Sequence, residues 1–82
     1  MNLTRETQDK ILIKKRKEDK NGRDYLILEL EKDEVVFVFD NKDTPQANWH
    51  QLEEGEEYLF TIKEGKIGTN LLIHFEKVDF II

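Results

Sequence analysis

Apolar residues recur at every second position through much of this chain, and that spacing predicts β-strands. The clearest case is residues 24–31 (DYLILELE), where three leucines fall on one face and polar or mixed residues on the other. Residues 10–16 (KILIKKR) form a shorter apolar segment that ends in charge. Residues 35–40 (VVFVFD) are β-branched or aromatic up to their last position, a composition that favours strands. These segments predict three successive strands.

Two short polar connections separate these strands. Asn21-Gly22 is a strong hairpin signal because both residues tolerate a positive φ. Residues 32–34 (KDE) make a second tight connection. The sequence therefore predicts an antiparallel meander over residues 10–40.

The strand pattern stops at residues 41–55 (NKDTPQANWHQLEEG). Thr44 is suited to a helix N-cap, Pro45 to the first helical position, and Gly55 to the C-terminal end. We expect a short helix of about two turns here. Its side chains available for burial are Ala47, Trp49 and Leu52.

Two further strands are predicted after this helix. In residues 56–63 (EEYLFTIK) large apolar side chains alternate, and Tyr58 and Phe60 are expected in the core rather than at a site. Residues 64–68 form a loop with a glycine near each end. Residues 69–78 (TNLLIHFEKV) are expected to form the last strand.

The expected order is β-β-β-α-β-β, which matches the five-stranded Greek-key barrel called the OB-fold. The fold class is therefore all-β with one short helix. The helix would close the open end of the barrel, with Trp49 as the plug rather than as a stacking surface. SH3-like and Sm-like barrels also have five strands, but the place of the helix between the third and fourth strands favours the OB-fold.

Length and composition fit one small domain. The chain has 82 residues and no cysteine, so packing alone must stabilise it. We expect an N-terminal arm over residues 1–9, the OB-fold domain over residues 10–79 and an apolar tail over residues 80–82. No apolar run approaches the roughly 20 residues of a membrane span. We expect a soluble cytoplasmic protein without membrane contact.

The charge is distributed unevenly along the chain. The net charge is −5, yet residues 1–23 hold eight basic and four acidic residues, and residues 24–82 hold five basic and 14 acidic residues. Six of the 13 basic residues lie in KKRKEDKNGR, residues 14–23, at the end of the first predicted hairpin. Because salt screens charges over about 8 Å, a ligand responds mainly to the charge it touches. A patchy solvated surface is the alternative interpretation.

The run from VVFVFDNKD through WHQLEEGEEYLFTI, residues 35–62, resembles the second half of the single-stranded DNA-binding OB domains of the replication protein A type. The resemblance rests on Phe39-Asp40 at the end of the third strand and on the pattern Leu52-x-x-Gly55-x-x-Tyr58-x-Phe60. It covers roughly residues 10–78. The Asp-x-x-Gly turn usual in that group is absent, and EKDE stands in its place.

The resemblance implies that single-stranded DNA, or RNA, lies across the second and third strands between two clamping loops. Lys and Arg would contact phosphates, and aromatic rings would stack on bases. The implied binding residues are Lys14, Lys15, Arg16, Lys17, Lys20, Arg23, Tyr25, Phe37, Phe39, Lys63 and Lys66.

Periodicity alone leaves the orientation of the third strand open. If Val36 and Val38 point into the barrel, Phe37 and Phe39 face solvent, but the opposite phase is equally regular. A lysine-rich hairpin end can also be a solvated loop or can protect an exposed edge.

The sequence gives little support for a catalytic site or a metal site. The chain has no Ser or Cys nucleophile and no Gly-rich phosphate loop, so we expect no enzyme and no cofactor. His50 and His74 lack ligand-spaced partners, so no metal site is expected. The alternative function is an OB domain for protein contact or assembly. Acidity favours it, as does the tail Phe80-Ile81-Ile82, which could bind a protein partner or mediate self-association.

Overall fold

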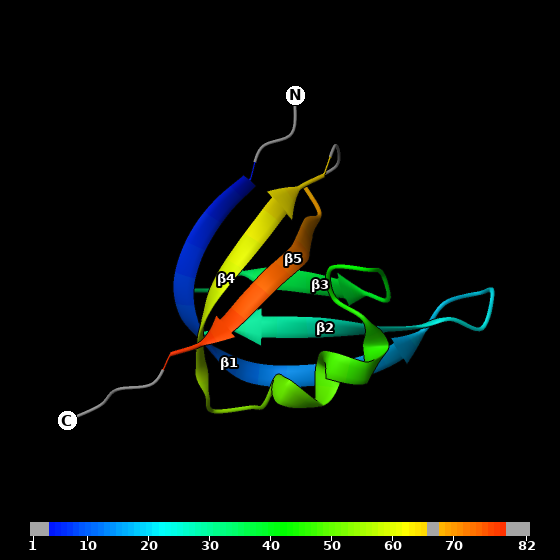
Figure 1. The fold of residues 1–82 in the computed structure, drawn as a ribbon, viewed down its shortest axis with the longest axis horizontal. Helices are drawn as coiled ribbons and strands as arrows, with labels where there is room; N and C mark the ends of the chain where they lie inside the picture. Colours follow the sequence, from blue (N-terminus) through cyan, green and yellow to red (C-terminus); the bar gives the residue numbers. More distant parts are fainter. Residues whose placement is uncertain (1–3, 66–67, 79–82) are drawn as a thin grey trace.

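The computed structural model describes residues 4–65 and 68–78 as a five-stranded barrel with one short helix. The expected tail over residues 80–82 lies outside the described residues. Figure 1 shows the strands wrapped around a common interior and the helix at one end of the barrel. The elements are β1 (Thr4–Glu18), β2 (Asp24–Leu30), β3 (Val35–Phe39), η1 (Gln46–Gln51), β4 (Glu57–Glu64) and β5 (Asn70–Lys77).

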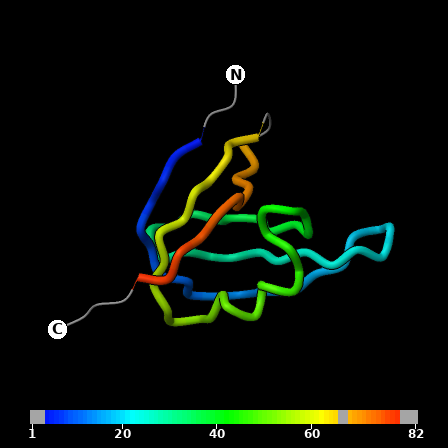
Figure 2. The backbone as a smooth tube through the Cα atoms, in the orientation of Figure 1, coloured from blue at the N-terminus to red at the C-terminus, as the bar shows by residue number. Residues whose placement is uncertain are grey.

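The strands close in the order β1-β2-β3-β5-β4, and β4 returns to β1. Neighbours pair antiparallel except β3 and β5, which run parallel and meet at Phe37 and Leu71. This connectivity, with the helix between β3 and β4, confirms the predicted all-β OB-fold barrel. The β1–β2 hairpin extends beyond the barrel (Figure 2).

β1 is longer than predicted because it serves both halves of the barrel. It pairs with β4 from Thr4 to Lys10 and with β2 from Ile11 to Glu18, with a register shift between Ile11 and Ile13. Residues 4–9, expected in an N-terminal arm, are therefore strand. This segment has no apolar alternation, so its spacing does not predict a strand. It is a strand because its backbone groups pair with those of β4.

The core is formed by alternate residues of the strands, as the apolar spacing predicted. Trp49 and Leu52 join it from the end of the barrel, and Trp49 is only 2% exposed. The indole Nε1 of Trp49 donates a hydrogen bond to the carbonyl of Thr44 at 2.9 Å. Trp49 is therefore the predicted plug. The strand residues of the core are Ile11, Leu26, Leu28, Leu30, Val36, Val38, Tyr58, Phe60, Ile62 and Leu72.

The helix differs from its prediction in several respects. It is a 3₁₀ helix that starts after Pro45, and no side chain caps it. Thr44 is buried and its hydroxyl donates to the carbonyl of Phe39 at 2.9 Å, so it anchors the end of β3 instead of capping. Ala47 is exposed. Gly55 lies beyond the helix in the turn before β4, with φ +86°, and its amide donates to Ile11.

Tyr58 connects the end of the helix to the barrel. Its hydroxyl donates to the carbonyl of Gln51 and accepts a hydrogen bond from the amide of Glu53 at 2.9 Å. Burial raises the pKa of Tyr58 above its usual value, since the ionised phenolate would lose hydration. The tyrosine is a core residue, as expected.

The β1–β2 connection is wider than a two-residue Asn-Gly turn. β-pairing ends at Glu18 and Asp24, and only Gly22 has a positive φ, +80°. The carboxylate of Asp19 accepts hydrogen bonds from the amides of Asn21 and Arg23 at 2.8 and 2.9 Å. The Asp19 side chain thus stabilises a longer loop, which the prediction from Asn21-Gly22 alone did not include.

Removing the plug should destabilise the whole barrel. We expect Trp49→Ala to lower the free energy of unfolding by about 3–5 kcal/mol, because the large cavity cannot be refilled by the short helix. Urea denaturation followed by circular dichroism measures this. The neighbouring exposed His50→Ala is the control and should change stability by less than about 0.5 kcal/mol. Equal effects of the two substitutions would contradict the assignment of Trp49 as plug.

Candidate nucleic-acid interface

The orientation of β3 follows from the burial of its valines. Val36 and Val38 are fully buried, whereas Phe37 is half-buried and Phe39 is 41% exposed. Tyr25, opposite Phe39 on β2, is also half-buried. Both phenylalanines therefore face outward, which confirms the phase on which the binding hypothesis depends.

The three outward rings form one cluster, which we call the aromatic face: Tyr25, Phe37 and Phe39. The ring centroids of Tyr25 and Phe39 lie 5.5 Å apart with an interplanar angle of 27°, and those of Phe37 and Phe39 lie 6.4 Å apart at 12°. Mutual packing restricts the rotamers of the rings, so an arriving planar group meets a platform that is already ordered.

The strand register places lysines on both sides of the aromatic face. Residues directly opposite in neighbouring strands carry their side chains on the same side of the sheet. One such row crosses three strands, and a second crosses five. The rows are Lys17–Tyr25–Phe39 and Lys15–Ile27–Phe37–Leu71–Lys63–Thr4, where β1 contributes both ends of the second.

These lysines differ in how far they are engaged. Lys15 forms an ion pair with Glu29 at 3.1 Å, and the two side chains are 51% and 38% exposed, so water and salt weaken the pair. Lys17 is exposed and has no ion-pair partner among the described residues. Lys63 is half-buried beside Leu71. Lys15 and Lys17 thus lie on the β1 side of the aromatic face, and Lys63 lies on the other side beyond Leu71.

Lys14 and Arg16 lie on the opposite side of the hairpin. The Lys14 ammonium donates to the carbonyl of Trp49 at 3.0 Å, and the Arg16 guanidinium lies 5.8 Å from the centre of the Trp49 ring. Arg16 also pairs with Asp24. The structure therefore does not bring Lys14 and Arg16 to the aromatic face; they hold the hairpin against η1, because side chains alternate along a strand.

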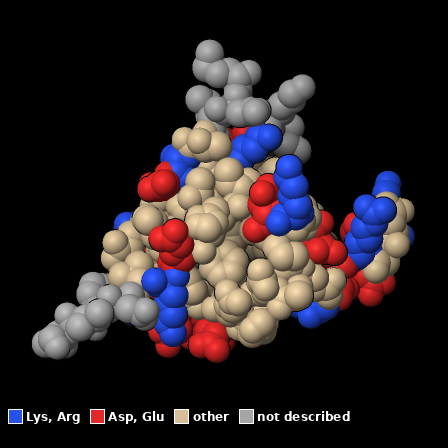
Figure 3. All heavy atoms as spheres, in the orientation of Figure 1, with Lys and Arg blue, Asp and Glu red and all other residues tan. Residues whose placement is uncertain are grey.

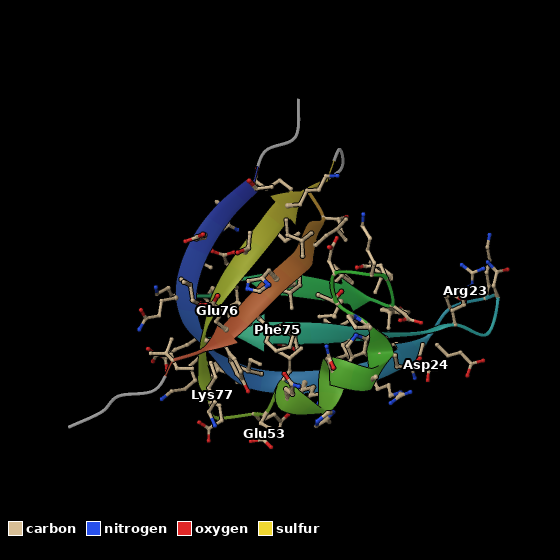
Figure 4. The ribbon with its side chains drawn as sticks, viewed as in Figure 1. Arg23, Asp24, Glu53, Phe75, Glu76 and Lys77 are labelled. Atoms are coloured by element: carbon tan, nitrogen blue, oxygen red, sulfur yellow. The ribbon has the colours of Figure 1, made fainter. Side chains whose placement is uncertain are left out.

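Lys20 and Arg23 occupy the hairpin loop. Both are exposed, and Figure 3 shows basic side chains gathered at the projecting end of the hairpin with acidic side chains beside them. In Figure 4, Arg23 points away from the barrel and Asp24 lies closer to it. The last predicted contact, Lys66, lies outside the described residues.

A polar pocket next to the aromatic face was not anticipated from the sequence. It has a volume of about 460 Å³, and Asp19, Arg23, Asp24, Phe39 and Asp40 are among its lining residues. Each carboxylate already accepts hydrogen bonds: Asp19 from loop amides, Asp24 from Arg16, and Asp40 from an amide of η1. These acids repel phosphate, so a bound strand would keep its backbone on the lysine side.

In residues 4–65 and 68–78, no three acidic or histidine side chains converge on a position suited to a metal ion. The same residues contain no helix that is long and apolar enough to cross a membrane. Neither a protein-family model nor a curated protein matches the chain. The resemblance to replication protein A-type domains therefore remains a prediction, while the OB-fold rests on the barrel topology.

Outward rings should be removable without loss of the fold. We expect Phe37→Ala with Phe39→Ala to keep the native circular dichroism spectrum and cooperative unfolding, since neither ring fills the core. Phe60→Ala, which empties a fully buried position, is the contrasting variant and should cost about 3–5 kcal/mol on its own. Unfolding of the double variant under native conditions would be inconsistent with an exposed aromatic face.

Proposed function

We propose that this chain is a binding module for single-stranded nucleic acid, with DNA as its main ligand, acting in replication, repair or recombination. One observation carries the proposal: the aromatic face lies outward on β2 and β3, in register with lysines from β1 and β4. Aromatic rings offer stacking surfaces that accept any base, and the neighbouring ammonium groups match a phosphate backbone.

Binding would combine two kinds of contact. Bases stacked on the aromatic face contribute about 1–3 kcal/mol each, with little dependence on sequence. Each phosphate neutralised by a lysine releases counterions and adds about −0.7 to the salt slope for a single strand. The exposed groups of Lys20 and Arg23 extend the cationic border along the hairpin. The acidic remainder of the chain opposes binding elsewhere on its surface.

Loss of the stacking rings should abolish most of the affinity. We expect Phe37→Ala with Phe39→Ala to weaken binding of a fluorescein-labelled 15-mer of dT about thirtyfold or more, measured by fluorescence anisotropy at low salt. Anisotropy is preferable to intrinsic fluorescence because Trp49 is buried and does not report on the aromatic face. Unchanged affinity in a folded double variant would eliminate the stacking mechanism.

The two faces of the hairpin provide a matched test of the phosphate contacts. Lys15→Ala with Lys17→Ala should reduce the magnitude of the salt slope by about 1.4, since two phosphate contacts disappear. Lys14→Ala with Arg16→Ala removes the same charge from the same strand but from the side facing Trp49, and should leave the slope unchanged. Equal reductions of the salt slope in the two double variants would mean that binding depends on total charge alone, and would contradict phosphate contacts on the side of the aromatic face.

A protein-contact function is the second candidate, and the exposed apolar side chains favour it. Leu12, Ile13 and Val35 are 39–49% exposed, and Ile13 and Val35 lie in one row across β1, β2 and β3. The polar pocket beside Phe39, with three aspartates in its lining, also suits a protein better than a polyanion, because the carboxylates repel phosphate. If neither a 15-mer of dT nor one of rU binds at low salt and high micromolar concentration, the nucleic-acid proposal fails and protein contact becomes the better explanation.

A further inference from the structure

Within residues 4–65 and 68–78, one edge of β5 has no strand partner over most of its length. β5 pairs with β4 from Asn70 to Lys77, but on its other side it meets β3 only at Leu71. From Ile73 onward, no described strand pairs with that second edge. An open edge with free backbone groups is a template for pairing with another strand.

The phase of the free backbone groups follows from one hydrogen bond. The amide of Val78 donates to the carbonyl of Glu57 on the β4 side at 3.1 Å. Because consecutive residues direct their backbone groups to opposite edges, Glu76 also faces β4, whereas Phe75 and Lys77 direct N–H and C=O to the free edge. Phe75 and Lys77 therefore each present a backbone donor and a backbone acceptor at the free edge.

The free edge borders an open space. A pocket of about 590 Å³ lies between η1 and β5, and its lining includes His50, Glu53, Tyr58, Phe75 and Lys77. Phe75 is half-buried and packs edge-on against Tyr58, with ring centroids 6.0 Å apart. Figure 4 shows Phe75 on β5 between Glu76 and the helix side, and the surface at the centre of Figure 3 is largely uncharged.

We propose that a second copy of this chain pairs with this edge, β5 against β5, antiparallel about a twofold axis at Phe75. The axis places His74 opposite Glu76 of the second copy, and the same pair recurs on the other side of the axis. Within one copy, Nε2 of His74 lies 3.2 Å from Oε1 of Glu76, and both side chains are exposed. In the proposed dimer each imidazole also has the Glu76 carboxylate of the second copy as its direct cross-strand neighbour, so the two pairs can be exchanged between the copies. β5 is thus self-complementary, as a twofold interface requires.

The Glu76 carboxylates also make the register that is shifted by one residue unfavourable. If the axis passed through Glu76, the two Glu76 carboxylates would be directly opposed, which is unfavourable for a cross-strand pair. With the axis at Phe75, the N–H and C=O of Phe75 exchange two hydrogen bonds with their symmetry copies. The pocket beside the ring provides space for the second Phe75. The resulting sheet would run β4-β5-β5-β4 across both copies.

The interface is separate from the aromatic face on β2 and β3, so it does not depend on nucleic-acid binding. Sedimentation velocity over a range of concentrations tests it directly. We expect a reversible monomer–dimer equilibrium, and we expect Glu76→Lys to raise the dissociation constant about tenfold. The double variant His74→Glu with Glu76→His exchanges the two residues and keeps an imidazole opposite a carboxylate on each side of the axis. It should therefore bind its second copy with most of the affinity of the original protein.

Two controls make the outcome decisive. Glu31→Lys makes the same change in net charge at an exposed position on the distant β2–β3 turn, and should leave the dissociation constant unchanged. Removal of residues 80–82 should also leave it unchanged. A purely monomeric protein overturns the proposal, as does a dimer that is insensitive to Glu76→Lys or is lost with residues 80–82.

Amide hydrogen exchange followed by NMR identifies the paired edge. As protein concentration rises, exchange at Phe75 and Lys77 should slow about tenfold or more, whereas Glu76, already bonded to β4, should change little at low occupancy of the dimer. Protection that instead grows on the exposed residues of β1 and β3, with Phe75 and Lys77 unaffected, would place the contact on the other face and overturn the proposal.

Discussion

Burial of the inner side chains of β2 and β3 is the constraint on which the rest of the structure depends. Five side chains on these strands, three leucines and two valines, lie in the core. Because the strand period is two, their burial forces the alternate residues to the outside. Tyr25, Phe37 and Phe39 therefore face outward as a consequence of barrel formation, and the proposed function depends on this contiguous group of rings.

β1 contributes the second determinant, through a single change of register. A strict period of two from the buried Ile11 would carry Ile13 and Lys15 inward. The shift between Ile11 and Ile13 reverses the alternation, so that Lys14 and Arg16 face Trp49 while Lys15 and Lys17 accompany the aromatic rings. One irregularity thus divides the basic stretch into a structural half and a half available to a ligand.

The two proposed surfaces use different properties of the same barrel. The aromatic face lies on the outer surface of the paired strands β2 and β3, so its side chains are the groups presented to a ligand. The free edge of β5 offers backbone donors and acceptors, and its selectivity comes from the alternation of His74, Phe75 and Glu76. Among the described residues this edge is open because β3 pairs with β5 at Leu71 alone.

The sequence by itself determined the number and order of strands, the position of the helix and the identity of the plug, because apolar spacing and residue type are local properties. It could not set the direction of the aromatic rings, since either phase of VVFVF has the same period. Nor could it separate Lys14 and Arg16 from Lys15 and Lys17, place residues 4–9 in β1, or reveal the acidic pocket. Those features depend on strand pairing between distant segments, on a register shift and on closure of the barrel, and only the tertiary structure decides them.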